Sequence, residues 1–315
     1  MNENVIWGII YILTFVVVFA CSVIFTLKFP AGLKNATKVK WSESVGLCYT
    51  DIPYGDGELN KFDLYFPADS SKESYGLVVY IHAGGFRGGD KKEDASMCHF
   101  FVSKGYVAAA VNYTLHMDEK PCSVYTMSRE IEKSIPVIKE EAAKLGYNID
   151  RMAMMGGSAG GCLALIYAYR DASGSPIPVK CAIEAVGPAC FEPAAWFGES
   201  IDDDASAAFC KILTGEDITP EMIRNGEYKK ILKQISPYAL VTKNTIPTLF
   251  AHGTHDKLVP ISTTKYLVRA LEENNVPFDF IEFPHSGHGL HNDRKQFKLY
   301  SAKLEEYLEK YLASN

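Results

Sequence analysis

The sequence has no basic stripe, no internal repeat and no low-complexity tract. Its 38 acidic residues outnumber its 32 Lys and Arg residues, so the formal net charge is −6. Proteins that bind nucleic acid gather Lys and Arg on one face to contact phosphates, and we therefore expect no nucleic-acid partner. Residues 31 to 315 suit one large domain, because about 250 to 300 residues can still bury a single core.

The cysteines lack the spacing of a disulfide framework or of a zinc site. Cys21 lies in the N-terminal apolar segment, and an odd number of cysteines follows that segment. This usage favours reduced, mostly buried thiols and no metal site.

No Lys or Arg precedes the apolar run from Val5 to Leu27. As a helix at about 1.5 Å per residue, this run would measure about 35 Å and could cross a bilayer core. A cleaved signal peptide is the alternative, but such a peptide has a basic start and a shorter apolar stretch. The sequence therefore predicts a retained single-pass anchor over residues 1 to 30, with residues 5 to 27 in the cell membrane.

Four lysines follow the predicted anchor: Lys28, Lys34, Lys38 and Lys40. Only the amino terminus is basic on its other side, so the positive-inside rule places the large domain on the cytoplasmic side. Reduced cysteines favour the same side.

Short β-rich runs alternate with helical runs in the large domain. This order predicts an α/β fold with a mostly parallel central sheet and helices on both faces. Strands are expected at 59 to 66, 77 to 81, 106 to 111, 152 to 155, 179 to 185, 248 to 251 and 278 to 283. Helices are expected at 128 to 145, 159 to 170, 261 to 274 and 293 to 312. Pro136 should kink the first helix or delay its start.

The interval from 187 to 244 breaks this alternation, since it is long and interrupted by several prolines. It predicts a cap inserted into the catalytic domain, although an ordinary helical connection is the alternative. Its acidic patch, Asp202 to Asp204, is expected to be solvated rather than to bind a metal.

Ser158 lies at the centre of Gly156-Gly157-Ser158-Ala159-Gly160, between a predicted strand and a predicted helix. A serine held in a strained turn there exposes its hydroxyl, and glycines two residues away on each side keep the turn free of collisions. A G-x-S-x-G pattern also occurs by chance, so the strand-turn-helix context carries the prediction that Ser158 is a nucleophile.

A nucleophilic serine needs donors for the oxyanion that forms on the substrate. The first apolar strand runs into His82-Ala83-Gly84-Gly85, where the backbone N–H groups of Gly84 and Gly85 can approach a carbonyl oxygen. The N–H of Ala159 would complete the oxyanion hole. A plain glycine turn is the alternative, and His82 is expected to be structural.

The serine also needs a base and an acid that orients the base. Asp256 follows the strand at 248 to 251 and is the expected acid, with a plain turn aspartate as the alternative. The loop after the last strand contains His285, His288 and His291. We expect His288 to be the base, because glycines on both sides let the backbone aim its ring at the serine.

The order Ser158, Asp256, His288 is that of the α/β-hydrolases. From about residue 45 onward the chain resembles the esterase/lipase branch of that superfamily, in its hormone-sensitive-lipase-like and bacterial acetyl-esterase or feruloyl-esterase-like group. The resemblance rests on the stretches FDLYFP, VVYIHAGGF, GYVAAAVNYTL, GGSAGG and ISPYALVTKNTIPTLFAHGTHDKLVP, and on HGL around His288. The sequence departs from this group at two motifs. It has His-Ala-Gly-Gly where the group usually has three glycines, and Asn112-Tyr113-Thr114-Leu115 where the group usually has Asp-Tyr-Arg-Leu.

These residues predict a serine carboxylesterase that forms an acyl-enzyme on Ser158 and needs no metal or cofactor. The resemblance implies a small-molecule ester substrate with a short acyl group such as acetyl. A peptidase or amide hydrolase of the prolyl-oligopeptidase-like type is the alternative, since the same triad cleaves amides. A non-catalytic binding protein on this fold is a third alternative, although no member of the triad is missing.

Overall fold

The computed structural model describes residues 39–198 and 200–313. The predicted anchor lies outside these residues. Within the described ranges, no helix is both long enough and apolar enough to span a bilayer.

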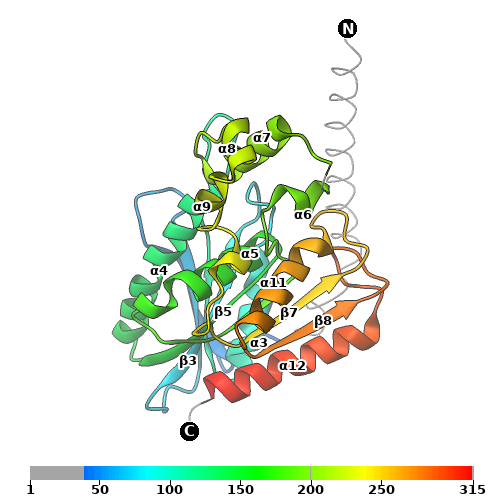
Figure 1. The fold of residues 1–315 in the computed structure, drawn as a ribbon. Helices are drawn as coiled ribbons and strands as arrows, with labels where there is room; N and C mark the ends of the chain where they lie inside the picture. The colour runs from blue at the N-terminus through cyan, green and yellow to red at the C-terminus, as the bar shows by residue number, and fades with distance from the viewer. Residues whose placement is uncertain (1–38, 199, 314–315) are drawn as a thin grey trace.

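An eight-stranded sheet forms the centre of the described chain, in the order β1-β2-β4-β3-β5-β6-β7-β8 (Figure 1). β2 pairs antiparallel with β1 and β4, and the remaining neighbours pair in parallel. The predicted α/β-hydrolase fold with a mostly parallel sheet is therefore confirmed. The strands are β1 (Gly46–Pro53), β2 (Lys61–Pro67), β3 (Tyr75–Ile81), β4 (Val107–Val111), β5 (Ile149–Gly157), β6 (Val179–Ala185), β7 (Thr248–Gly253) and β8 (Phe278–Phe283).

The edge strand of the sheet, β1, was not predicted from the sequence. Its side chains are mostly exposed or half-buried, so no apolar run marks it. Its pairing with β2 shifts register between Tyr49 and Ile52, and the intervening Asp51 has a φ of 57°. This bulge further obscures the alternation that predicts a strand.

Helices cover both faces of the sheet and create two apolar cores. On one face α4 (Val124–Lys144), α5 (Ala159–Ile166) and α11 (Ile261–Glu273) contribute the buried side chains. On the other face α3 (Ala95–Ser103) and α12 (Arg294–Leu312) do so. The sequence did not predict α3, because this apolar segment has no strong helical period.

Pro136 lies inside α4 and does not delay its start. α4 begins at Val124, before the predicted boundary, because Ser123 caps it: the Ser123 hydroxyl accepts a hydrogen bond from the Thr126 N–H at 3.1 Å. An N-cap of this kind satisfies a backbone donor that the first helical turn leaves free.

Most of the short helices between β6 and β7 lie at the end of the molecule away from α12 (Figure 1), and the last of them contacts α5 and α11 instead. Its acidic patch has local structural roles: Asp202 caps α7 by accepting from the Ala205 N–H at 2.7 Å, and Asp203 pairs with Arg224 at 3.1 Å. The helices are α6 (Pro193–Phe197), α7 (Asp203–Thr214), α8 (Pro220–Asn225), α9 (Tyr228–Leu232) and α10 (Pro237–Leu240).

Candidate active site

Ser158 occupies a strained turn between β5 and α5, with φ 51° and ψ −125°. A Cβ atom on Gly160 would lie 2.0 Å from the Ile81 carbonyl oxygen, and one on Gly156 would lie 2.4 Å from the Gly160 carbonyl carbon. Only glycine fits at these two positions, because backbone atoms cannot move aside as side chains can. The Ser158 N–H donates to the Ala185 carbonyl at 2.8 Å and ties the turn to β6.

The structure brings Ser158, His288 and Asp256 together from three separate loops. The Nε2 atom of His288 lies 2.9 Å from the Ser158 Oγ, and its Nδ1 lies 2.7 Å from the Asp256 Oδ2. The His288 side chain is 23% exposed and the Asp256 side chain is fully buried. This geometry lets the imidazole receive the serine proton on one side while the carboxylate orients it on the other.

Asp256 is held as an ionised acceptor. Its Oδ1 accepts from the N–H groups of Leu258 at 2.9 Å and Val259 at 3.0 Å. Burial by itself would raise the pKa of this carboxyl, but interactions with His252 and His288 and the Val259 N–H hold the pKa well below its usual value. The carboxylate can therefore stabilise a protonated His288.

His288 lies in the site, whereas His285 points elsewhere. His285 is 77% exposed on its side chain, and its Nδ1 contacts the Asp293 Oδ1 at 2.8 Å. The other oxygen of Asp293 accepts from the His285 N–H at 2.9 Å and the Ser286 hydroxyl at 2.7 Å. Asp293 therefore fixes the loop that carries His288.

The expected oxyanion donors come from two separate segments of the chain. Gly84 and Gly85 follow β3 with φ values of 132° and 61°, and Ala159 is the first residue of α5. Within residues 39–198 and 200–313, the N–H groups of these three residues donate to no protein acceptor. Free amides beside a serine nucleophile can bind the oxygen of a tetrahedral intermediate.

Comparison with known proteins identifies the family. A family model described as BD-FAE matches residues 62–271, which is more than half of the chain. The chain belongs to the BD-FAE family. The predicted resemblance to esterase/lipase-type α/β-hydrolases is thereby confirmed.

Solved structures share the fold of this BD-FAE family member. A truncated carbohydrate esterase from gut microbiota superposes with a TM-score of 0.69 at 19% identity, covering 85% of this chain and 98% of the other. The butyrate-bound esterase Est2 of Thermogutta terrifontis gives 0.66 at 19% identity, over 85% and 96% of the two chains.

Two curated relatives are named as a formamidase and a peptidase, and each matches this chain over part of its own length. A kynurenine formamidase from Danio rerio is 28% identical over 45% of this chain and 45% of its own length. Dipeptidyl peptidase family member 6 from Caenorhabditis elegans is 24% identical over 84% of this chain and 34% of its own length. This BD-FAE family member thus spans less than half the length of these relatives.

In this family member, hydrogen bonds and a ring contact hold the expected oxyanion loop, residues 82 to 86, in place. The Gly84 carbonyl accepts from the N–H groups of Arg87 at 3.1 Å and Gly88 at 3.0 Å. His82 is buried, and its ring stacks on Tyr113 with centroids 4.3 Å apart. The Tyr113 hydroxyl donates to the His82 carbonyl at 3.1 Å, so His82 occupies a structural position here.

The two substitutions in the Asn112-Tyr113-Thr114-Leu115 motif have local partners. The Asn112 Oδ1 accepts from the Lys91 N–H at 2.7 Å, and its Nδ2 donates to Asp90 at 3.1 Å. The Thr114 N–H and hydroxyl each donate to the Glu130 carboxylate at 2.7 Å, which ties the loop after β4 to α4.

Two buried ionisable residues behind the site, Glu184 and His252, were not predicted from the sequence. Burial raises the pKa of Glu184 to about 7, although His252 and the Gly187 N–H act against that rise. Burial lowers the pKa of His252, but its contacts with Asp256, Val259 and Glu184 outweigh this and raise it above the ordinary value. A lone acid within the apolar strand at 179 to 185 was the available signal for Glu184.

Contacts with two other segments of the site hold α6 in place. Toward the expected oxyanion glycines, the ring centroid of Phe191, just before α6, lies 6.4 Å from that of Phe86. The Phe191 ring also stacks on Trp196, with a centroid distance of 6.0 Å. On the acid side, the Ser262 hydroxyl donates to the Ala195 carbonyl. These contacts join α6 to the segments that carry the oxyanion glycines and Asp256.

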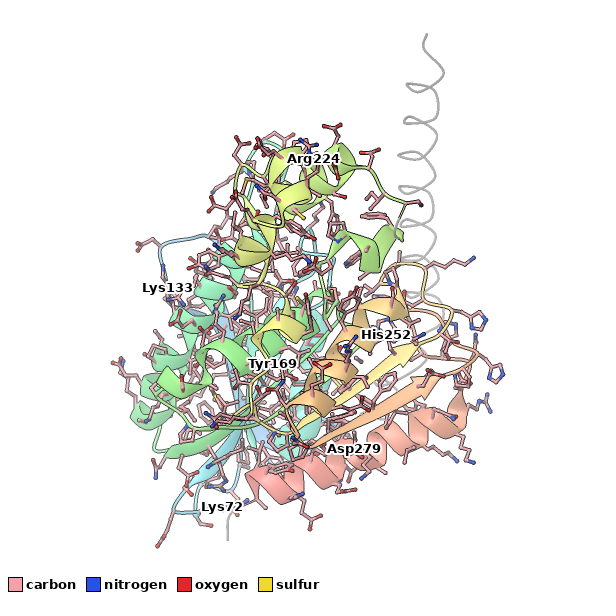
Figure 2. The ribbon with its side chains drawn as sticks, in the orientation of Figure 1. Lys72, Lys133, Tyr169, Arg224, His252 and Asp279 are labelled. Carbon is pink, nitrogen blue, oxygen red and sulfur yellow. The ribbon has the colours of Figure 1, made fainter. Side chains whose placement is uncertain are left out.

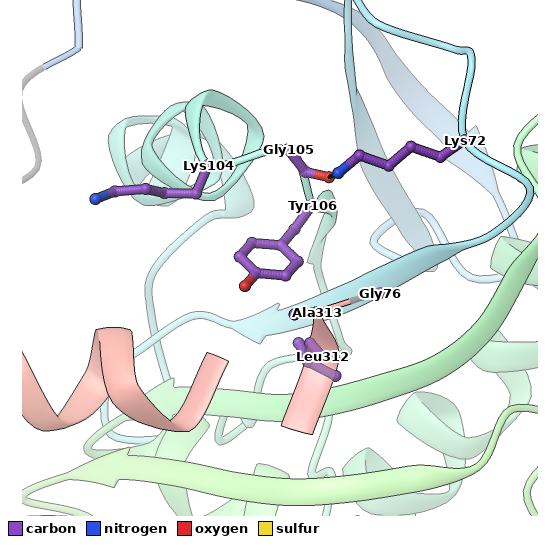
Figure 3. A pocket seen from close by; sticks show the side chains of 7 residues that line it. All are labelled: Lys72, Gly76, Lys104, Gly105, Tyr106, Leu312 and Ala313. Carbon is purple, nitrogen blue, oxygen red and sulfur yellow. Dashed lines mark hydrogen bonds between the residues drawn. The ribbon is translucent and has the colours of Figure 1, made fainter. Parts of the chain in front are cut away.

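Two hollows lie outside the triad. One, of ≈ 270 Å³, lies at the edge where β3 and β4 begin (Figure 3). Ser158 follows the end of β5, at the opposite edge of the parallel sheet. The other, of ≈ 670 Å³, separates residues 116 to 126 from α7. The second hollow adjoins the oxyanion loop, since the His116 N–H donates to the Phe86 carbonyl at 2.8 Å.

Proposed function

We propose that this chain hydrolyses carboxylic esters through an acyl-enzyme on Ser158. The observation that carries the proposal is the pair of contacts made by His288, 2.9 Å to the Ser158 Oγ and 2.7 Å to the Asp256 Oδ2. A serine hydroxyl is a weak nucleophile until a neighbouring base takes its proton, and His288 is placed to do so.

In the first half-reaction His288 takes the Ser158 proton as Oγ attacks the ester carbonyl. The resulting oxyanion accepts hydrogen bonds from the N–H groups of Gly84, Gly85 and Ala159. His288 then gives its proton to the departing alcohol oxygen, and an acyl-enzyme remains. In the second half-reaction His288 takes a proton from water, which attacks the acyl carbon and releases the acid and free Ser158.

The test is hydrolysis of short nitrophenyl esters by the full chain in detergent. We expect Ser158→Ala to lower kcat on the order of 10⁴-fold or more, because the remaining groups retain only transition-state binding. A fluorophosphonate probe should label the wild type and not this variant. Labelling that persists in Ser158→Ala would overturn the proposal, whereas an unlabelled wild type would favour a non-catalytic binding protein.

We propose a small-molecule substrate with a short acyl group. Est2 of Thermogutta terrifontis, which shares this fold, binds butyrate, and in this chain Phe191 links Trp196 of α6 to Phe86, next to the expected oxyanion glycines. A series of nitrophenyl esters from acetate to palmitate tests the point, and kcat/KM is expected to fall steadily beyond about four acyl carbons. A maximum at long chains would instead assign the protein as a lipase.

Amide hydrolysis is the second candidate, because curated relatives of this chain include a formamidase and a dipeptidyl peptidase. The same triad serves both bonds, since the two reactions differ mainly in the leaving group. Matched ester and anilide substrates with one acyl group separate the candidates. A kcat/KM for the anilide equal to or above that for the ester would favour the amide.

We further propose that residues 5 to 27 tether the enzyme to the cell membrane, with residues 31 to 315 as the catalytic domain on the cytoplasmic side and 187 to 244 as its cap. The apolar run and the lysines after it support this arrangement. Protease treatment of intact cells should leave the catalytic domain uncleaved in the membrane fraction. Its cleavage in intact cells would reverse the orientation, and its recovery in the soluble fraction would exclude the tether.

A further inference from the structure

Two ionisable side chains that the proposed mechanism does not use lie directly behind the triad. Glu184 and His252 are fully buried near the ends of the neighbouring strands β6 and β7. Figure 2 shows His252 beside α11, where its Nδ1 lies 2.8 Å from the Thr264 Oγ1.

His252 contacts two points of the loop between β7 and α11, which carries the triad acid. Its Nε2 lies 2.9 Å from the Val259 carbonyl oxygen and 3.4 Å from the Asp256 Oδ2. With its proton on Nε2, the His252 ring donates a hydrogen bond to the Val259 carbonyl and faces the Asp256 carboxylate. Its Nδ1 then accepts a hydrogen bond from the Thr264 hydroxyl. One buried ring thereby fixes the loop at two points and is itself fixed by α11.

His252 and His288 face the same carboxylate oxygen. The Asp256 Oδ2 lies 2.7 Å from the His288 Nδ1, while its Oδ1 is already committed to two backbone N–H groups. The His252 ring therefore lies against the oxygen that orients His288, and we expect its displacement to move that oxygen. A shift of about 1 Å at a reacting group can cost about 10²-fold in rate.

Glu184 supports the serine side of the site. Its Oε2 accepts from the Gly187 N–H at 2.7 Å, and its Oε1 has no hydrogen-bond partner among the described residues. Gly187 lies against the nucleophile turn: a Cβ atom there would be 3.1 Å from the Ser158 carbonyl oxygen and 2.8 Å from the Glu184 Oε2. The carboxyl group thus holds the segment that packs on the back of Ser158.

We propose that His252 and Glu184 are positioning residues for the triad, His252 acting through the Asp256 carboxylate and Glu184 through the Gly187 N–H behind Ser158. This inference rests on the proposed hydrolase function. Neither side chain reaches the substrate, so their effect falls on the chemical step rather than on binding.

Kinetics of full-chain variants test the role of His252. We expect His252→Leu to lower kcat for a short nitrophenyl ester by about 10- to 100-fold, with KM changed by less than about twofold. His252→Gln keeps an N–H donor for Val259 and should recover part of the loss. His255→Gln is the matched control, because His255 is exposed in the same loop and contacts Thr254 instead. A wild-type kcat in His252→Leu would overturn the proposal.

A second pair of variants tests Glu184. Glu184→Gln keeps a side-chain oxygen that can accept from Gly187, so its kcat should remain within about threefold of the wild type. Glu184→Leu removes the acceptor and should lower kcat by about 10-fold or more. Equal kcat values for the two variants would overturn the role of the hydrogen bond.

Proton NMR of the free enzyme provides a readout that needs no substrate. The proton between the His288 Nδ1 and Asp256 should resonate at low field, and its position should shift in His252→Leu but not in His255→Gln. If His252→Leu does not fold, Thr264→Val removes only the hydroxyl at Nδ1 and should move the resonance in the same direction. An unmoved resonance would overturn the inference. An inactive wild type with a shifted resonance would overturn only the proposed function.

Discussion

At the scale of one residue, the nucleophile turn leaves no room for a side chain at Gly160. α5 begins so close to the end of β3 that a Cβ atom on Gly160 would meet two backbone oxygens, at 2.0 Å from Ile81 and 2.5 Å from His82. The same contact sets the distance between the serine and the oxyanion loop, because that loop starts at His82.

We therefore expect Gly160→Ala to lower the free energy of unfolding by about 3 kcal/mol or more and to abolish ester hydrolysis. Urea denaturation followed by circular dichroism measures the first effect, and nitrophenyl acetate hydrolysis measures the second. Gly174→Ala is the control, since nothing lies within 4 Å of its Cβ position, and it should change stability by less than about 1 kcal/mol. Equal behaviour of the two variants would contradict the steric argument.

Glu184 makes the stability of the fold depend on pH. Its pKa is about 7 in the folded protein against an ordinary value of 4.5, so the folded state binds the proton more tightly than the unfolded state. The contribution of Glu184 is fully present below pH 4.5 and is lost as the pH rises through 7.

Glu184→Gln removes this titration. We expect the decrease in the free energy of unfolding between pH 5 and pH 8 to become smaller in the variant, by on the order of 3 kcal/mol at most. The raised pKa of His252 acts in the same direction, and in the variant it loses only the part of that rise that the Glu184 charge causes. Urea titrations of both proteins at the two pH values give the comparison, and an unchanged difference would show that Glu184 does not titrate in this range.

At the scale of elements, α6 joins the proposed cap to the loops that carry Phe86 and Asp256. Trp196 holds this short helix by stacking on Phe191 and by donating its indole N–H to the Cys190 carbonyl at 2.8 Å. Its ring also lies 5.5 Å from that of Phe209 in α7, between centroids. A helix of five residues has too few internal hydrogen bonds to persist without such contacts.

We expect Trp196→Ala to release α6 and to raise KM for short esters by about 10-fold, with a smaller change in kcat. Trp196→Phe keeps the stacking and loses only the N–H donor, so its KM should lie between those of the wild type and the alanine variant. Steady-state kinetics with nitrophenyl butyrate measures both variants. An alanine variant with the KM of the wild type would mean that α6 does not shape the ester site.

At the scale of the whole molecule, the proposed cap at 187 to 244 shares an apolar core with the sheet. The chain leaves β6 for the cap and returns to β7, and these two strands pair directly. The buried side chains of α7 and α9 also belong to the same apolar core as those of α4 and α5.

We therefore expect the cap and the sheet to unfold together. A Trp7→Phe, Trp41→Phe variant leaves Trp196 as a fluorescent reporter in the cap, while circular dichroism reports the whole chain. The two urea transitions should coincide within error. A fluorescence transition at lower urea would show instead that the cap unfolds as a separate unit.

The sequence by itself was sufficient for the parallel part of the fold and for the candidate triad. Buried parallel strands such as 77 to 81 are continuous apolar runs, and the observed bounds of β6 and β8 match the predicted 179 to 185 and 278 to 283. Ser158, Asp256 and His288 each follow such a strand, and the carboxyl ends of parallel strands meet at one edge of a sheet. Local pattern and chain order therefore brought these residues together in the prediction.

Only the tertiary structure decided what depends on contacts between distant segments. The edge strand β1 has no apolar run, and its bulge at Asp51 is held by the buried Lys91, whose Nζ lies 2.7 Å from Asp51 and 2.7 Å from Asp63. Glu184 and His252 are likewise ordinary polar residues in the sequence. Their partners come from α11 and from the loops that carry Ser158 and Asp256, and no local pattern encodes which distant backbone group a buried polar atom will contact.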